Sequence, residues 1–267
     1  MIEMIEPTTL IILALVAFLA GFIDAVAGGG GMLTVPALLS LGLPPHIALG
    51  TNKLAATFAS STAAWTYYRK QLFSPHFWRL SFIATLAGAI GGTLIVDIIS
   101  TEWLEKALPL IILAAAAYTL WHPQPKGEQR QLPKDDPKLK KKQWLQGGLL
   151  GFYDGVAGPG TGAFWTVSSM ALYRLDILLA SGLAKAMNFT SNITSLITFA
   201  ILGHINVALG LTMGVCLMIG AYIGAHSAIR FGAKFIRPVF VTVVVILAGK
   251  LVGRLGSNIA LVSYREG

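Results

Sequence analysis

The sequence is short of charge, and this shortage argues against a water-soluble protein. Only 12% of its 267 residues are Asp, Glu, Lys or Arg, whereas 55% are hydrophobic. About a quarter of the residues in an ordinary soluble domain are charged, because a surface that faces water needs them. The chain is therefore predicted to be an integral membrane protein whose main partner is the lipid bilayer.

Cysteine is almost absent as well. Cys216 is the single example, so an intramolecular disulfide and a cysteine metal cluster are excluded. The histidines His46, His204 and His226 have no ligand-like spacing with carboxylates or thiols. No nucleotide-binding glycine motif and no catalytic triad stands out. We therefore expect no metal site, no cofactor and no enzyme activity.

Charge-free stretches dominate the chain, and many are long enough to cross a membrane. A spanning helix needs about 20 apolar residues, because ~30 Å of hydrocarbon is crossed at ~1.5 Å per residue. We expect one helix near Trp144 and others at 8–27, 47–68, 79–98, 104–121, 177–200, 205–227 and 236–255. Two shorter apolar helices are expected at 32–43 and 161–173, and whether they cross or re-enter stays open.

The chain also repeats itself. Residues 21–30 read GFIDAVAGGG, and residues 151–160 read GFYDGVAGPG at an offset of 130. At an offset of 132, Lys53 corresponds to Lys185. The repeat predicts a first transmembrane half at 1–125, a linker at 126–142 and a second transmembrane half at 143–267.

Basic residues indicate how the two halves are oriented. The linker region is rich in Lys and Arg, which favours the cytoplasm and explains its charge without a nucleic-acid partner. Arg69 with Arg79, and Arg230 with Lys234, mark two further cytoplasmic loops. We thus expect an all-α, multi-pass protein with two inverted-topology halves, which have five segments each if the two short helices also cross.

Polar groups that interrupt the apolar helices mark the expected site. Asp24 and Asp154 precede glycine-rich breaks, at which the backbone N–H groups of Gly29, Gly30 and Gly160 would face an anion. The alternative is that the glycines only form turns and each aspartate only caps a helix.

Lysines at equivalent repeat positions strengthen this expectation. Lys53 and Lys185 lie within apolar sequence, where an ionised group usually faces a partner or a cavity, although a lysine near a helix end can also snorkel. Their polar neighbours are candidate ligand contacts or helix-to-helix hydrogen bonds: Thr51, Asn52, Asn188 and Asn192. Close helix contacts are expected from the small-xxx-small pairs Gly88 with Gly92 and Gly220 with Gly224.

These motifs together resemble the sulfite exporter TauE/SafE family. The resemblance rests on GFIDAVAGGGG from Gly21, GTNK from Gly50, GFYDG from Gly151 and KAMNFTSN from Lys185. It implies a secondary transporter of a small anion, such as sulfite or an organosulfonate like sulfoacetate, in a bacterial inner membrane.

The mechanism keeps several alternatives. Alternating access is expected, with Asp24 and Asp154 as candidate proton carriers. A passive anion channel and a membrane assembly protein without flux are the other interpretations. Whether the chain forms a homodimer is left open.

Overall fold

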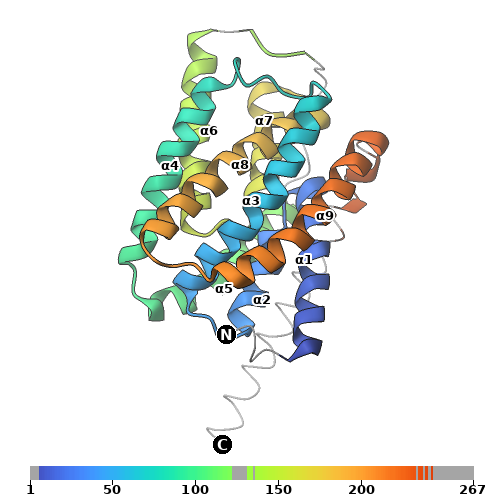
Figure 1. Ribbon diagram of the computed structural model, residues 1–267. Coiled ribbons are helices and arrows are strands. Elements are labelled where there is room, and N and C mark those ends of the chain that lie inside the picture. Colours follow the sequence, from blue (N-terminus) through green and yellow to red (C-terminus); the bar gives the residue numbers. More distant parts are fainter. Residues whose placement is uncertain are drawn as a thin grey trace, which may run out of the picture.

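A computed structural model describes residues 6–121, 131–134, 136–232, 234–236, 238–239 and 242, and this part of the chain is helical (Figure 1). The helices of the first half are α1 (Pro7–Ala27), α2 (Gly31–Ser40), α3 (Pro45–Arg69), α4 (Arg79–Ile98) and α5 (Thr101–Trp121). Those that follow the linker are α6 (Pro137–Val156), α7 (Thr161–Tyr173), α8 (Ile177–Ile201) and α9 (Val207–Phe231). The predicted helix at 236–255 lies almost wholly outside the described residues, as do linker residues 126–130.

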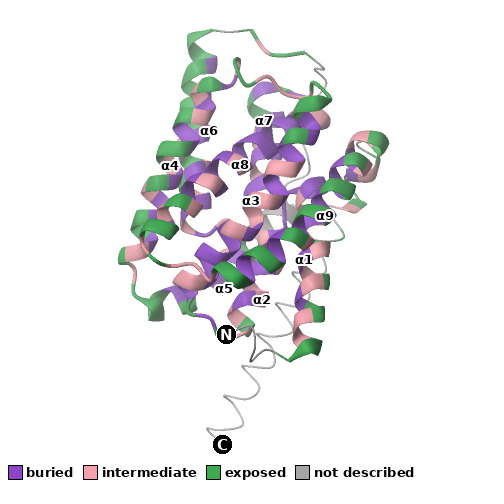
Figure 2. Ribbon diagram, in the orientation of Figure 1, coloured by how far each residue is buried: buried purple, intermediate pink, exposed green. Residues whose placement is uncertain are grey.

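Three of the described helices are long and apolar enough to cross a membrane by themselves, namely α1, α4 and α9. Helices α3 and α8 are equally suited by length, at 25 residues each, but carry Lys, Asn, Ser and Thr side chains. They pack against each other, and α9 and α4 pack against them in turn. Figure 2 shows that much of α3 and α8 is buried, which keeps their polar side chains away from lipid.

Glycines let the outer helices approach closely, as the small-xxx-small spacing predicted. A Cβ atom at Gly88 or Gly92 of α4 would lie 2.3 or 2.2 Å from a backbone oxygen of α6. A Cβ atom at Gly220 or Gly224 of α9 would lie 2.0 or 2.5 Å from a backbone oxygen of α1. Helix α4 therefore packs on α6 in the same manner as α9 packs on α1, and the predicted close contacts are confirmed.

The central helices α3 and α8 run antiparallel. A Cβ atom at Gly50, near the start of α3, would lie 2.0 Å from the carbonyl oxygen of His204, just beyond the end of α8. A Cβ atom at Gly182, near the start of α8, would lie 2.5 Å from the carbonyl oxygen of Leu72, just beyond the end of α3. The two contacts involve residues that correspond at the repeat offset of 132.

Two helix breaks interrupt the pairs α1–α2 and α6–α7. Gly28 ends α1 with φ of 82°, and Gly158 and Gly160 follow α6 with φ of 88° and 81°. Such left-handed backbone favours glycine, because a side chain is strained there. Helix α7 has the predicted bounds, whereas α2 ends at Ser40, three residues earlier than predicted, because the chain turns at Gly42 with φ of 78° before α3 begins.

Candidate functional site

Helix α3 places Lys53, and α8 places Lys185, inside the protein. Each side chain is only 1% exposed. A charged amine at this depth needs a partner, because its desolvation is expensive. Both lysines lie well inside their helices, so neither is a snorkelling side chain at a helix end.

Lys53 binds the end of α6. Its Nζ atom lies 2.9 Å from Oδ1 of Asp154 and donates a hydrogen bond of 2.5 Å to the backbone oxygen of the same residue. Asp154 is itself buried, and its Oδ1 also accepts a 3.0 Å hydrogen bond from the hydroxyl of Thr161 at the start of α7. The second oxygen, Oδ2, is buried without a partner among the described residues. One carboxylate thus joins α3, α6 and α7.

Lys185 binds the end of α1 in the corresponding way. Its Nζ atom donates to the backbone oxygen of Asp24. The Asp24 carboxylate is half-buried, and its Oδ1 accepts a hydrogen bond of 3.2 Å from the backbone N–H of Gly30. The two lysines are therefore crossed: the lysine of each repeat contacts the aspartate that precedes the helix break of the other repeat.

The two helix breaks, between α1 and α2 and between α6 and α7, also contact each other. The N–H of Ala163 donates a 3.2 Å hydrogen bond to the carbonyl oxygen of Gly28. A Cβ atom at Gly28 would lie 2.3 Å from the backbone of Gly162, so only glycine permits this approach. Of the three glycines predicted to face an anion, Gly30 has its N–H occupied by Asp24. Gly29 lies in the same helix break, and Gly160 lies in the other one.

The four polar residues near the lysines fall into two groups in the structure, according to whether their side chains have hydrogen-bond partners. Thr51 accepts a 2.9 Å hydrogen bond from the N–H of Asn206, and the Asn52 amide oxygen accepts one of 2.5 Å from Thr34. Both side chains therefore tie α3 to neighbouring segments. Asn188 and Asn192 are each 5% exposed, and their amides make no hydrogen bond within the described part of the chain.

Comparison with known proteins decides the family. Residues 13–251 match the description "Sulfite exporter TauE/SafE". The chain belongs to this family. No solved structure matches it.

Bacterial relatives agree with this assignment. The TauE/SafE chain is 36% identical over 248 residues to "Probable membrane transporter protein YfcA" of Escherichia coli K12, which covers 93% of the chain and 91% of the relative. It is 40% identical over 186 residues to a "Probable membrane transporter protein" of Haemophilus influenzae, covering 68% and 70%. A Sinorhizobium protein named "Probable membrane transporter protein ORF9" is 37% identical over 235 residues, covering 88% and 89%. The chain is thus a multi-pass membrane protein of a transporter family.

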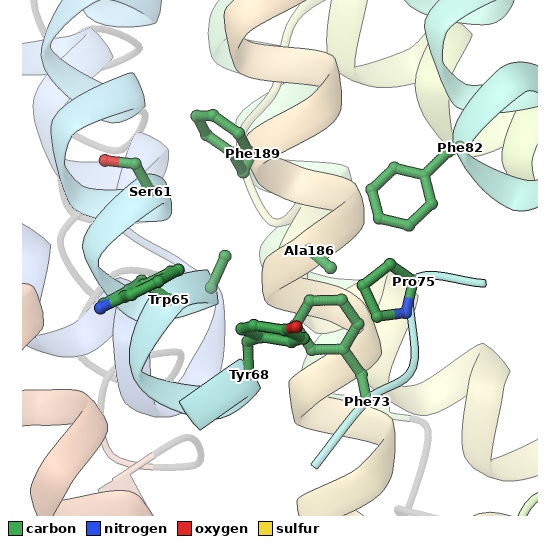
Figure 3. Close-up of a pocket in the computed structure, with 9 residues that line it drawn as sticks. Ser61, Trp65, Tyr68, Phe73, Pro75, Phe82, Ala186 and Phe189 are labelled. Carbon is green, nitrogen blue, oxygen red and sulfur yellow. The ribbon is translucent and has the colours of Figure 1, made fainter. Parts of the chain in front are cut away.

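A cavity of about 420 Å³ lies against the TauE/SafE helix α8 (Figure 3), and neither Lys53 nor Lys185 lines it. Its walls are apolar and mostly aromatic, and α8 contributes only Ala186 and Phe189 to them. A small anion would lose its hydration there without gaining hydrogen bonds. This cavity is therefore unsuited to a small anion, and it is a separate feature from the site of the crossed lysines.

Sequence reasoning missed one ionisable contact. The Nε2 atom of His204, in the connection between α8 and α9, lies 2.7 Å from Oδ1 of Asp97 near the end of α4. The His46 ring lies beside that of His204, with centroids 5.3 Å apart and the ring planes tilted by 39°. Because 107 residues separate His204 from Asp97, no spacing rule could have found the pair. Among the described residues no cluster of His, Cys, Asp and Glu could hold a metal ion.

Proposed function

We propose that this TauE/SafE protein is a secondary transporter that carries a small anion across the bacterial inner membrane by alternating access. The observation that carries the proposal is the crossed contact of Lys53 with Asp154 and of Lys185 with Asp24. Ionised groups at membrane depth are costly and commonly mark the path of a substrate or ion. Here they lie at the two helix breaks, the usual place for a transporter site.

The donors at this site suit an oxyanion. Lys53 and Lys185 supply positive charge, and the amides of Asn188 and Asn192 supply neutral hydrogen-bond donors. A tetrahedral or pyramidal anion accepts from several donors at once, as sulfite and sulfonates do. The family description supports a sulfur oxyanion such as sulfite as the substrate, and an organosulfonate such as sulfoacetate carries a similar oxyanion group.

Charge balance suggests how transport couples to protons. With both aspartates and both lysines ionised, the site is neutral, and an incoming anion must compete with a carboxylate for Lys53. Protonation of Asp154 would remove that competitor and leave a net positive charge for the anion. At the other break, a neutral Asp24 would loosen its hold on the N–H of Gly30 and let that donor face the substrate.

Alternating access would use two inverted halves. Support comes from α3 and α8, which correspond in the repeat and run antiparallel, and from the matching contacts of α4 with α6 and α9 with α1. Each lysine belongs to one half and contacts the helix break of the other half. Relative motion of the halves would therefore form and disrupt both contacts. In this scheme Thr51 and Asn52 keep α3 tied to its neighbours.

Flux measurements in proteoliposomes test the proposal. The purified protein is reconstituted and offered radiolabelled sulfite, a sulfonate and a carboxylate of similar size. We expect saturable uptake of a sulfur oxyanion or sulfonate that unlabelled substrate drives by counterflow. Flux without saturation or counterflow would instead support a passive channel. Neither flux nor binding of any of these anions would support the assembly protein.

A further inference from the structure

The apolar cavity in Figure 3 lies next to a second hollow of different character. We call the first one the aromatic groove, and its walls come from α3, α4, α8 and the segment between α3 and α4: Ser61, Ala64, Trp65, Tyr68, Phe73, Pro75, Phe82, Ala186 and Phe189. The second, which we call the basic basin, has a volume of about 750 Å³. Tyr68, Phe73 and Pro75 line both, so the two hollows are contiguous.

The aromatic groove opens on the outer face of the helix bundle. Trp65 is 60% exposed, and Ile83 on α4 beside the groove is 52% exposed. In a membrane protein such apolar outer surface meets lipid tails. The volume of about 420 Å³ is more than ten times the ~30 Å³ share of one water molecule and falls in the range of ordinary ligand pockets.

The basic basin is more polar than the aromatic groove. Arg69, Gln71, Ser74 and His76 line it, and none of its described lining residues is acidic. The Arg69 guanidinium lies 5.9 Å from the centre of the Trp65 ring, which holds the positive charge at the junction of groove and basin. Leu179 of α8 also lines the basin, and the nearby Asp176 carboxylate accepts the N–H of Leu179 at 2.8 Å as a helix cap.

An aromatic groove joined to a basic basin is complementary to a molecule that has an apolar chain and an anionic headgroup. We propose that this surface binds an anionic phospholipid, with an acyl chain along Trp65, Phe82 and Phe189 and the phosphate at Arg69 and His76. Basic residues beside membrane helices attract anionic headgroups, and Trp and Tyr favour the level of the headgroups. The site is independent of the proposed transport function, because its residues do not include the crossed lysines.

Photocrosslinking tests this inference in the unaltered protein. The probe is phosphatidylglycerol with a diazirine in its acyl chain, present as a minor component of phosphatidylcholine vesicles. We expect preferential labelling of peptides that contain Trp65, Tyr68 and Phe189 over Leu15 and Leu19 of α1, which are nearly as exposed as Trp65. A phosphatidylcholine probe with the same chain should label the groove several-fold less. Equal labelling of the groove and α1, or by both probes, would overturn the proposal.

Variants locate the headgroup and the chain separately by native mass spectrometry of lipid retained after delipidation. Arg69→Gln and Ser61→Phe should each lower retained phosphatidylglycerol at least threefold, the first by removing charge and the second by filling the groove. Arg79→Gln and Ile83→Phe are the matched controls, because both residues are exposed nearby but line neither hollow. Equal losses from Arg79→Gln and Arg69→Gln would contradict a specific site. A changed oligomeric state in Ser61→Phe with unchanged lipid would show that a second copy fills the groove, and would overturn the proposal too.

Discussion

The amine of Lys53 and the carboxylate of Asp154 form a buried ion pair across 101 residues of sequence, with Nζ and Oδ1 2.9 Å apart. Their side chains are 1% and 2% exposed. Isolated buried charges are costly, and a pair offsets that cost only when both members are present. The pair therefore ties the folding of the protein to the site proposed for the anion.

Loss of one partner should affect both stability and binding. Lys53→Ala leaves the Asp154 carboxylate buried without its cation, which should lower the free energy of unfolding by about 3–5 kcal/mol. It should also weaken anion binding, because a positive charge is lost. Thermal unfolding in detergent and equilibrium binding of labelled sulfite measure the two effects.

A double variant separates the two effects. Lys53→Met combined with Asp154→Asn removes both charges and should recover most of the lost stability, but not anion binding.

Lys185→Ala should weaken anion binding as well, and arginine at either lysine position should not restore it, because guanidinium is larger and planar. Unchanged affinity in both alanine variants would leave the lysines with a structural role only.

Neutral aspartate variants test proton coupling. Asp24→Asn and Asp154→Asn keep the side-chain shape but mimic the protonated acid. Coupling predicts that at least one variant keeps counterflow while losing accumulation driven by a pH difference. The measurement is substrate uptake into proteoliposomes with and without an imposed pH gradient. Wild-type accumulation in both variants would show that these aspartates carry no proton.

Two adjacent glycines of α4 test the helix contact with α6. A Cβ atom at Gly92 would lie 2.2 Å from the Phe152 carbonyl oxygen, whereas one at Gly91 would lie 3.9 Å from the Phe152 ring. Gly92→Ala should therefore lower the free energy of unfolding by about 1–3 kcal/mol through overpacking. Gly91→Ala should be neutral or slightly stabilising, because alanine favours helix. Equal stability of the two variants, measured by unfolding in detergent, would contradict the close contact.

Reporter fusions test the orientation of the two halves. Fusions near Lys140 and near Lys234 should both report the cytoplasm, and one near Glu102 should report the opposite side. The reason is the retention of basic loops in the cytoplasm. Alkaline phosphatase and a fluorescent protein serve as complementary reporters at each position. A periplasmic signal near Lys234 would rule out the inverted arrangement.

Much of the helical fold follows from local sequence. The helix predicted at 79–98 has those bounds in the structure, and those at 177–200 and 47–68 differ from α8 and α3 by at most two residues at either end. Charge-free runs and glycine breaks are local signals, so they can be read without knowledge of neighbours. Helix α5 begins at Thr101, three residues before the predicted start at 104, because its first turn is charged and lacks the apolar character of membrane sequence.

The roles of the site residues could be predicted only in part. Lys53 and Lys185 stood out because a charge inside an apolar run is conspicuous. Thr51 and Asn52 looked like ligand contacts, yet the structure has them bonded to Asn206 and Thr34. Whether a polar side chain already has a hydrogen-bond partner depends on residues far away in the chain. Local patterns in a single sequence do not show which distant residues come into contact.

The sequence by itself determined that the chain is a membrane protein, that it repeats, and that two lysines and two aspartates hold equivalent positions in the repeat. Composition and periodicity suffice for this, because the bilayer demands apolar helices of a certain length. Only the tertiary structure decided that each lysine contacts the aspartate of the other repeat, and that an aromatic groove adjoins a basic basin. Both depend on how helices cross, and close packing of side chains from distant segments sets those crossings.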